Sequence, residues 1–227
     1  MKIRTTLLLL PLAALGLAAA NGDPGASPLP DRWTPAELHA ALAAMPEGDP
    51  GRGRELHDRM FCASCHGPSG ESPSRNWPTV VGQRAPYVYK MLLDYRDGRL
   101  PHPEAEPMAV LAEMMSEQEM ADVAAFYDAQ ALPALAPLRK QHPADTLVRR
   151  GDPERLITPC SACHGVDGQG GRNETPALAG QRPEYLVRAM RAFRDRSRDN
   201  DVHHGMGQFA WDLTDAEIEA LADYYAP

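Results

Sequence analysis

The chain has 227 residues and a formal net charge of −8 at pH 7, with 31 acidic against 23 basic side chains. Its basic residues form no stripe, which argues against a nucleic-acid-binding role because such proteins need a basic surface for phosphate groups. The length allows one domain or two small ones, and the 4 cysteines occur as two CxxC pairs, each followed by a histidine.

The first 20 residues have the pattern of an export signal. Lys2 and Arg4 precede an apolar core from Thr5 to Leu17, and three alanines ending at Ala20 form a small-residue cleavage site. A membrane anchor is the alternative, but a spanning helix needs about 20 apolar residues, and this run is shorter and contains Pro11. We therefore expect cleavage near Ala20, delivery to the periplasm and no transmembrane segment in the mature chain.

Residues 34–45 predict a capped helix ahead of the first cysteine pair. Thr34 suits the N-cap position, Pro35 the first helical position and Glu37 the third. No counterpart precedes the second cysteine pair. We expect this helix to pack on the first domain, with contact to a partner protein as the alternative.

The chain matches itself without gaps at an offset of 98 residues. CASCH at 62–66 aligns with CSACH at 160–164, and 17 of the 66 residue pairs that begin at 62 and 160 are identical. Two units are too few for a solenoid, so we interpret them as tandem copies of one small domain. The identical pairs include Pro78 with Pro176, Gly82-Gln83-Arg84 with Gly180-Gln181-Arg182, Tyr87 with Tyr185, and Met108 with Met206.

Residues 131–145 separate the two copies. They contain three prolines, which favour an extended and semi-rigid connection. We therefore expect a signal peptide at 1–20, an N-terminal extension with one helix at 21–46, a first domain at 47–130, a linker at 131–145 and a second domain at 146–227.

Both copies end in a predicted amphipathic helix. Residues 116–119 and 214–217 have the capping-box pattern, and apolar residues then recur at i, i+3, i+4 and i+7. Further helical patterns cover about 86–97 and 184–196, and a helix is expected just before each cysteine pair. No segment alternates convincingly like a β-strand, so the predicted fold class is all-α.

Three kinds of chemistry use the CxxC pattern. Zinc needs four ligands, and CxxC pairs that share one zinc ion usually lie about 15–20 residues apart. The two pairs in this chain are much farther apart in the sequence. Thiol exchange belongs to a βαβ pattern, which is not visible here. In the third chemistry, covalent haem c, two thiols bond the porphyrin and the next histidine binds the iron. We expect two haem c groups, held by Cys62, Cys65 and His66 and by Cys160, Cys163 and His164.

The sixth position of each iron decides whether a small molecule can bind and react there. Met108 and Met206 are matched between the copies, each 42 residues past the motif histidine and eight before the capping residue. We expect a loop to bring each sulfur to the iron, which would close the site and raise the reduction potential; core packing is the alternative. The competing ligands nearby, none of them matched between the copies, are His102, His203 and His204.

Each copy also carries a proline followed by GQR after the cysteine motif, as PTVVGQR and PALAGQR. With these motifs and the late methionines, residues 47–227 resemble the diheme cytochromes of the c-four type. The resemblance implies two class I cytochrome c domains packed around a pseudo-twofold axis, with the haem edges facing each other. It implies His66 with Met108, and His164 with Met206, as axial ligands. The extra N-terminal helix and the proline-rich PHPEAEPM segment depart from the family pattern.

The resemblance also suggests how the haems are supported. The carbonyls of Pro78 and Pro176 would accept hydrogen bonds from Nδ1 of the haem-binding histidines, which would fix the rings; a rigid turn is a compatible reading. The resemblance also suggests that side chains after each cysteine motif bind the haem propionates, because arginine makes charge-assisted hydrogen bonds to carboxylates. Ordinary pairing on the surface is the alternative. The residues expected at the haem propionates are Arg84, Arg182, Tyr87 and Tyr185.

The function that the resemblance implies is that of a periplasmic carrier of single electrons, not an enzyme. Its partners would be other redox proteins, with a dehydrogenase or a quinol-oxidising complex as the electron donor and a terminal oxidase as the acceptor. It could dock on a membrane complex, and it would not bind nucleic acid. The nearest alternative is the diheme electron-transfer subunit of a periplasmic dehydrogenase, such as one that oxidises a sulfur compound. A diheme peroxidase or thiosulfate dehydrogenase would need an open or unusual distal site, against which the matched methionines and the absence of a fifth cysteine argue.

Overall fold

The computed structural model describes residues 32–135 and 141–227. The predicted signal peptide, the start of the N-terminal extension and residues 136–140 of the predicted linker lie outside the described residues. Within the described ranges the chain forms helices and turns and no β-strand, only one isolated bridge. This confirms the all-α expectation.

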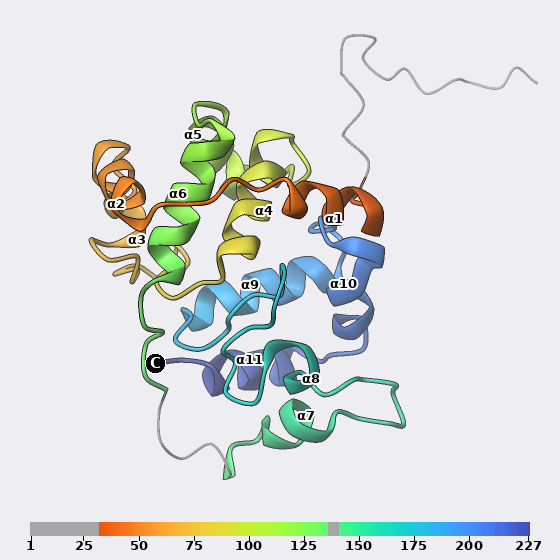
Figure 1. Cartoon of the computed structure of the whole chain (residues 1–227). Coiled ribbons are helices and arrows are strands. Elements are labelled where there is room, and N and C mark those ends of the chain that lie inside the picture. Colours follow the sequence, from red (N-terminus) through yellow and green to blue (C-terminus); the bar gives the residue numbers. More distant parts are fainter. Residues whose placement is uncertain (1–31, 136–140) are drawn as a thin grey trace, which may run out of the picture.

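The helices form two bodies, one above the other in Figure 1, with α2–α6 in the upper body and α7–α11 in the lower body. None of the described helices is long and apolar enough to cross a membrane. The α-helices are α1 (Pro35–Ala43), α2 (Pro50–Arg59), α3 (Ala63–His66), α4 (Ala85–Arg96), α5 (Glu106–Glu113), α6 (Glu117–Asp128), α7 (Asp145–Arg150), α8 (Ser161–His164), α9 (Pro183–Arg194), α10 (Gly205–Ala210) and α11 (Asp215–Tyr224), and two 3₁₀ turns are η1 (Pro103–Ala105) and η3 (Val202–His204).

The N-terminal body is built on the packing of α2 against α6. Gly53 in α2 lies so close to α6 that an added Cβ would come within 2.0 Å of the Asp122 carbonyl oxygen. Glycine is required there because it has no side chain to separate the two helices. α4 packs on both α5 and α6, and Met120 of α6 is completely buried in the shared core.

The C-terminal body repeats the packing of α4 on α5 and α6 around its own core. α9 packs on α10 and α11, and Val148 and Ile218 are completely buried. α7 begins at Asp145, one residue before the predicted start of the second domain, and ends where Gly151 adopts a φ of 67°. It is therefore shorter than α2, its counterpart before the first cysteine motif.

Equivalent loops of the two bodies make the same backbone hydrogen bonds. The Gly82 N–H donates to the Tyr127 carbonyl at 2.9 Å, and the Gly180 N–H donates to the Tyr225 carbonyl at 2.8 Å. Each bond ties the loop before α4 or α9 to the end of the last helix of its body. The 98-residue repeat of the sequence is therefore a repeat of the structure.

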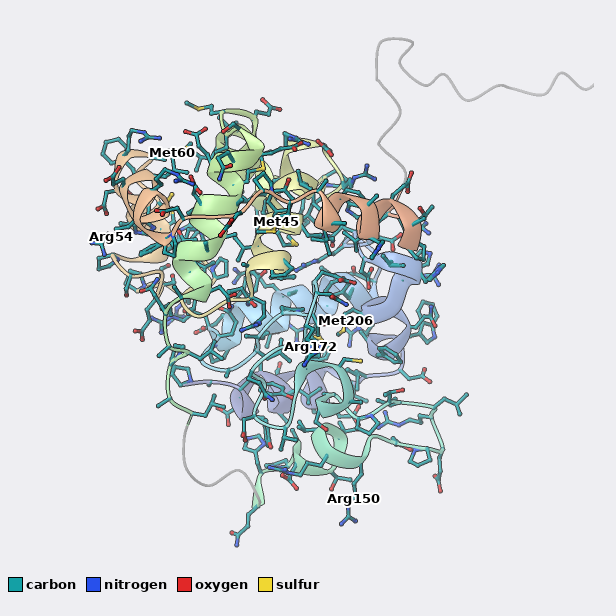
Figure 2. All side chains as sticks on the ribbon, viewed as in Figure 1. Met45, Arg54, Met60, Arg150, Arg172 and Met206 are labelled. Carbon is teal, nitrogen blue, oxygen red and sulfur yellow. The ribbon has the colours of Figure 1, made fainter. Side chains whose placement is uncertain are left out.

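The N-terminal extension packs on the N-terminal body, as expected. Thr34 and Glu37 form the predicted capping box at the start of α1. Trp33 and Leu38 are buried in the N-terminal core, and Met45, labelled in Figure 2, packs against it. The extension thus adds apolar residues to the core of the body that follows it.

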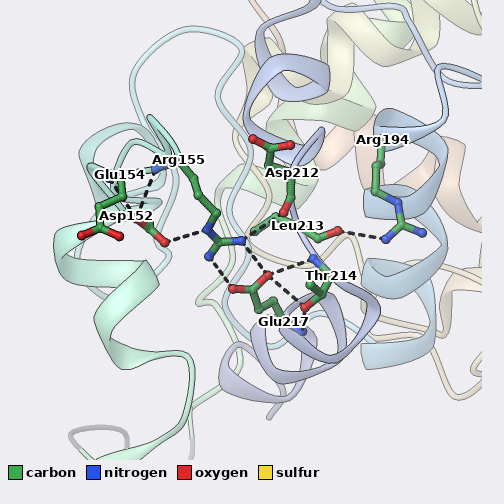
Figure 3. Close-up of polar contacts among 8 residues, drawn as sticks. All are labelled: Asp152, Glu154, Arg155, Arg194, Asp212, Leu213, Thr214 and Glu217. Atoms are coloured by element: carbon green, nitrogen blue, oxygen red, sulfur yellow. Dashed lines mark hydrogen bonds and ion pairs between the residues drawn. The ribbon is translucent and has the colours of Figure 1, made fainter.

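An ion-pair cluster holds the loop before the second cysteine motif against α11 (Figure 3). Arg155 donates to Asp152 Oδ2 at 2.6 Å and to Glu217 Oε1 at 2.5 Å. Glu217 also completes the capping box with Thr214. The hydrogen bond from Arg155, together with those from Thr214, lowers the pKa of Glu217 to about 2.

We predict that Glu217 contributes to the acid sensitivity of the folded chain. Its pKa falls from an ordinary 4.5 to about 2 on folding, so its stabilising effect is complete above pH 4.5 and is lost as the pH falls through this interval. Thermal unfolding followed by circular dichroism should show a smaller loss of melting temperature in Glu217→Gln than in the wild type between these two pH values. The exposed Glu154→Gln is the matched control, and equal pH dependence in wild type and Glu217→Gln would contradict the prediction.

Candidate haem-binding sites and the interface between them

The two cysteine motifs form the same short helical turn. The first cysteine of each motif lies directly before the turn, and the second cysteine and the histidine lie within it, in α3 and α8. Gly67 and Gly165 follow with φ values of 78° and 84°, which a residue with a side chain rarely adopts. This conformation ends the helix and turns the chain directly after the histidine.

Both motif histidines are buried and oriented by a proline carbonyl. His66 Nδ1 donates to the Pro78 carbonyl at 2.8 Å, and His164 Nδ1 donates to the Pro176 carbonyl at 2.9 Å. Burial also lowers the pKa of both rings, which favours the neutral form. With the proton on Nδ1, the lone pair lies on Nε2, the state in which imidazole binds a metal. This donor arrangement fits the attachment of a haem iron at each site.

The thiols of the motifs fit thioether bonds better than they fit the two alternatives. No disulfide joins the four cysteines, and no three His, Cys, Asp or Glu side chains come together as a metal site in the described part of the chain. Burial raises the pKa of Cys62 and raises that of Cys160 to about 11. A CxxC pair that exchanges disulfides usually has a lowered thiol pKa, so the structure does not favour thiol exchange.

Met108 and Met206 occupy equivalent places in the two bodies, but in short helices instead of the predicted loops. Met108 lies in α5, which packs on α4, and Met206 lies in α10, which packs on α9. The Met206 N–H donates to the Asp201 carboxylate at 2.6 Å, which helps to start α10. Both methionines are partly buried, and Figure 2 places Met206 in the middle of the molecule while Arg150 lies at its edge.

Two of the three competing histidines, His102 and His204, make contacts with surface groups, and His203 is exposed. His204 Nδ1 lies 2.5 Å from an Asp199 carboxylate oxygen, and its Nε2 lies 2.5 Å from the Arg32 guanidinium. His102 Nδ1 accepts a hydrogen bond from the Glu104 N–H at 3.2 Å. These ring nitrogens are thus engaged by neighbouring surface groups in this structure.

The two bodies meet through a reciprocal pair of glutamines. Gln181 accepts from the Thr79 N–H at 2.7 Å and donates to the Thr79 carbonyl at 2.8 Å. Gln83 accepts from the Ala177 N–H at 2.7 Å and donates to the Ala177 carbonyl at 3.0 Å. All four residues are buried. Since each pair is related to the other by the 98-residue offset, these contacts follow a pseudo-twofold axis.

The residues predicted at the haem propionates also lie around this interface. Arg84 pairs with Asp128 of its own body at 3.0 Å, whereas Arg182 crosses to the Ser72 carbonyl at 2.6 Å. Tyr87 accepts a hydrogen bond from Arg198 of the other body at 3.3 Å. Three of the four predicted residues therefore have polar contacts of their own, and those of Arg182 and Tyr87 link the bodies. Tyr185 is partly buried.

A second group of interface contacts breaks the twofold symmetry. Asp94 is completely buried and accepts hydrogen bonds from the Trp33 indole at 2.5 Å, from the Asn200 side chain at 2.5 Å and from the Lys90 ammonium. Lys90 also donates to the Asn200 carbonyl at 2.5 Å. The N-terminal extension, the N-terminal body and the C-terminal body thus meet at one carboxylate.

Sequence reasoning did not identify this buried cluster. A lysine and an aspartate one turn apart in the apolar stretch YVYKMLLDY of α4 are the signal that could have revealed it, because charged side chains are rarely buried without partners. Asn200 aligns with His102 and Arg198 with Leu100 in the repeat, so these contacts have no equivalent on the other side of the axis.

We predict that Asp94→Asn strongly destabilises the folded chain, since it leaves the buried Lys90 ammonium without its carboxylate. Removal of one partner of a buried pair costs about 3–5 kcal/mol of unfolding free energy. Urea unfolding of the haem-loaded protein should reveal this loss. The control is Asp97→Asn, which breaks the partly exposed pair with Arg96 and should cost at most ~1 kcal/mol; equal effects of the two substitutions would refute the prediction.

Comparison with known proteins places this architecture in a family. The cytochrome c family model matches residues 51–128 and again 154–225. Cytochrome c4 of Thiocapsa roseopersicina is 35% identical over 80% of this chain and 94% of that protein. A protein of Stutzerimonas stutzeri named thiosulfate dehydrogenase electron acceptor is 33% identical over 86% of this chain and 94% of its own.

A solved structure resembles the chain in three dimensions as well. Reduced recombinant cytochrome c4 from Pseudomonas stutzeri superimposes with a TM-score of 0.69 and 30% identity, over 78% of this chain and 97% of that one. The similarity thus extends over both bodies, as the two family matches do. The chain therefore belongs to the cytochrome c family, as a diheme member of the cytochrome c4 type that carries two covalently attached haem c groups.

Proposed function

We propose that the chain carries single electrons between redox proteins of the periplasm, with His66 and Met108 as the axial ligands of one iron and His164 and Met206 as those of the other. Haem c supplies the one-electron couple between ferric and ferrous iron. The observation that carries the proposal is the presence, in each body, of a buried neutral histidine held by a proline carbonyl.

The protein's own residues supply orientation and closure at each site. The Pro78 and Pro176 carbonyls fix the histidine rings so that Nε2 keeps its lone pair. Met108 and Met206 would occupy the remaining axial position with a thioether, which excludes small ligands. The same candidate ligands recur in both bodies, and a thioether at each sixth position would leave neither iron open to a substrate, which supports a carrier role.

Carbon monoxide binding to the reduced, haem-loaded protein tests the ligand assignment. The wild type should give no carbon monoxide difference spectrum, since a thioether holds both sixth positions. Met108→Ala and Met206→Ala should each bind carbon monoxide at one of the two haems. The control is Met114→Ala, because Met114 is 71% exposed and lies at the end of α5.

Binding of carbon monoxide by the wild-type protein would overturn the carrier proposal, because it would reveal an open site. An equal response in Met108→Ala and Met114→Ala would overturn the assignment of Met108 alone.

A second, more specific role is electron acceptance from a thiosulfate-oxidising enzyme. The relative from Stutzerimonas stutzeri that bears this role in its name matches this chain over both bodies, since the match covers 86% of the chain. In this role the donor would be a dehydrogenase that oxidises thiosulfate, and the chain would receive its electrons one at a time.

The reduction of the oxidised, haem-loaded chain by thiosulfate separates these roles. We predict no change in the haem absorption with thiosulfate alone, and rapid reduction after a catalytic amount of thiosulfate dehydrogenase is added. The Stutzerimonas stutzeri electron acceptor serves as the positive control. Failure of the chain to be reduced where that protein is reduced would exclude the specific role, and repeated turnover of thiosulfate without the dehydrogenase would make the chain an enzyme.

A further inference from the structure

Two peptide groups connect the histidine of one body to a glutamine of the other. The peptide group between Pro78 and Thr79 accepts from His66 Nδ1 through its carbonyl at 2.8 Å, and its N–H donates to Gln181 Oε1 at 2.7 Å. Each peptide group therefore holds a hydrogen bond at both ends. One bond is local to the body and the other comes from the opposite body.

The second copy repeats this arrangement in the opposite direction. The peptide group between Pro176 and Ala177 accepts from His164 Nδ1 at 2.9 Å, and its N–H donates to Gln83 Oε1 at 2.7 Å. The C-terminal body thus supplies the glutamine that bonds the peptide group holding His66, and the N-terminal body supplies the glutamine that bonds the peptide group holding His164.

Burial makes the two hydrogen bonds of each peptide group depend on one another. Thr79, Ala177 and both glutamines are 4–6% exposed, so water does not compete for these groups. Hydrogen bonds joined through a polarisable group strengthen one another in such an environment. Donation from the peptide N–H to the glutamine makes the carbonyl oxygen of the same peptide more negative, and the bond from the histidine Nδ1 becomes stronger.

A stronger bond at Nδ1 makes the imidazole a better electron donor at Nε2. A better donor favours ferric over ferrous iron and so lowers the reduction potential. We propose that Gln181 and Gln83 are positioning residues that each lower the reduction potential of the haem in the opposite domain, through the Pro78–Thr79 and Pro176–Ala177 peptide groups. This inference rests on the axial histidines proposed above.

If the glutamines only held the two domains together, their replacement would change the reduction potentials in a different way. Each glutamine also donates through Nε2 to the carbonyl of the same threonine or alanine, so its loss loosens the contact between the domains. Loosening exposes both haem sites to water and shifts both potentials. The peptide-mediated effect instead moves one potential in each variant, and the affected haem is always in the other domain.

The test is a potentiometric titration of the full, haem-loaded chain in the wild type, Gln181→Met and Gln83→Met. Methionine keeps the length of the side chain and removes both the acceptor and the donor. Gln118→Met is the control, since Gln118 bonds the Glu47 carbonyl and Asp122 within the N-terminal part of the chain. A separate titration of Met108→His identifies the midpoint of the N-terminal haem, because histidine in place of methionine lowers the potential.

We expect Gln181→Met to raise the midpoint of the N-terminal haem and Gln83→Met to raise that of the C-terminal haem. At fixed solution potential, the ferric-to-ferrous ratio of the affected haem should fall roughly two- to tenfold. In proton NMR of the reduced protein, the Nδ1 proton of His66 should move upfield in Gln181→Met, and that of His164 should not.

Equal shifts of both midpoints in each variant, or a shift of the haem in the same domain as the substitution, would overturn the inference. The inference would also be overturned if the glutamine variants kept two reversible one-electron steps but showed no change in either midpoint and no change in the position of either Nδ1 proton signal. The carrier proposal would survive these results, since it fails only if the wild type lacks those steps or binds carbon monoxide.

Discussion

The hydrogen bond from the motif histidine to the proline carbonyl is the interaction on which the rest of this structure depends. The distance from Nδ1 to the carbonyl oxygen is 2.8 Å in one domain and 2.9 Å in the other. The bond fixes the proton on Nδ1 and leaves the lone pair of Nε2 available for iron. The loop that supplies the carbonyl continues directly into Thr79 or Ala177, the residues bound by the glutamine of the opposite domain. Orientation of the histidine and docking of the domains are therefore properties of a single loop.

The interface combines a symmetric part with an asymmetric one. The glutamine contacts obey the pseudo-twofold axis, whereas the cluster around Asp94 joins the N-terminal extension, α4 and Asn200 on one side only. The symmetric contacts treat the two haem sites alike. The asymmetric contacts, including the one from Arg198 to Tyr87, give the N-terminal domain surroundings that its counterpart lacks, so the two sites of this chain are not electrostatically equivalent.

Much of the fold could be predicted because the information is local. The capping boxes at Ser116 and Thr214 and the helical periodicity behind them define α6 and α11 without reference to the rest of the chain. The cysteine motifs are equally local, and the 98-residue repeat, although it spans the chain, is visible in the sequence alone and indicates two haem domains. The sequence predicts loops at Met108 and Met206, where the structure has short helices, because Pro107 and the glycines around Met206 hide the helical pattern. The start of α10 also depends on the Asp201 side chain.

The partners that Gln83, Gln181 and Asp94 find in the opposite domain lie about 100 residues away in the sequence, so no local pattern could reveal these contacts. The spacing of Lys90 and Asp94 within α4 is a local sign of the buried cluster, but it does not indicate Asn200.

The symmetric glutamine contacts have a consequence for assembly. A contact in which each half presents the same groups to the other is isologous, as in a homodimer. The C-terminal domain of a second molecule could therefore make the same glutamine contact with the N-terminal domain of the first. The covalent connection keeps the contact within one molecule by raising the effective concentration of the second half, and exchange of halves between chains is the natural route to a dimer.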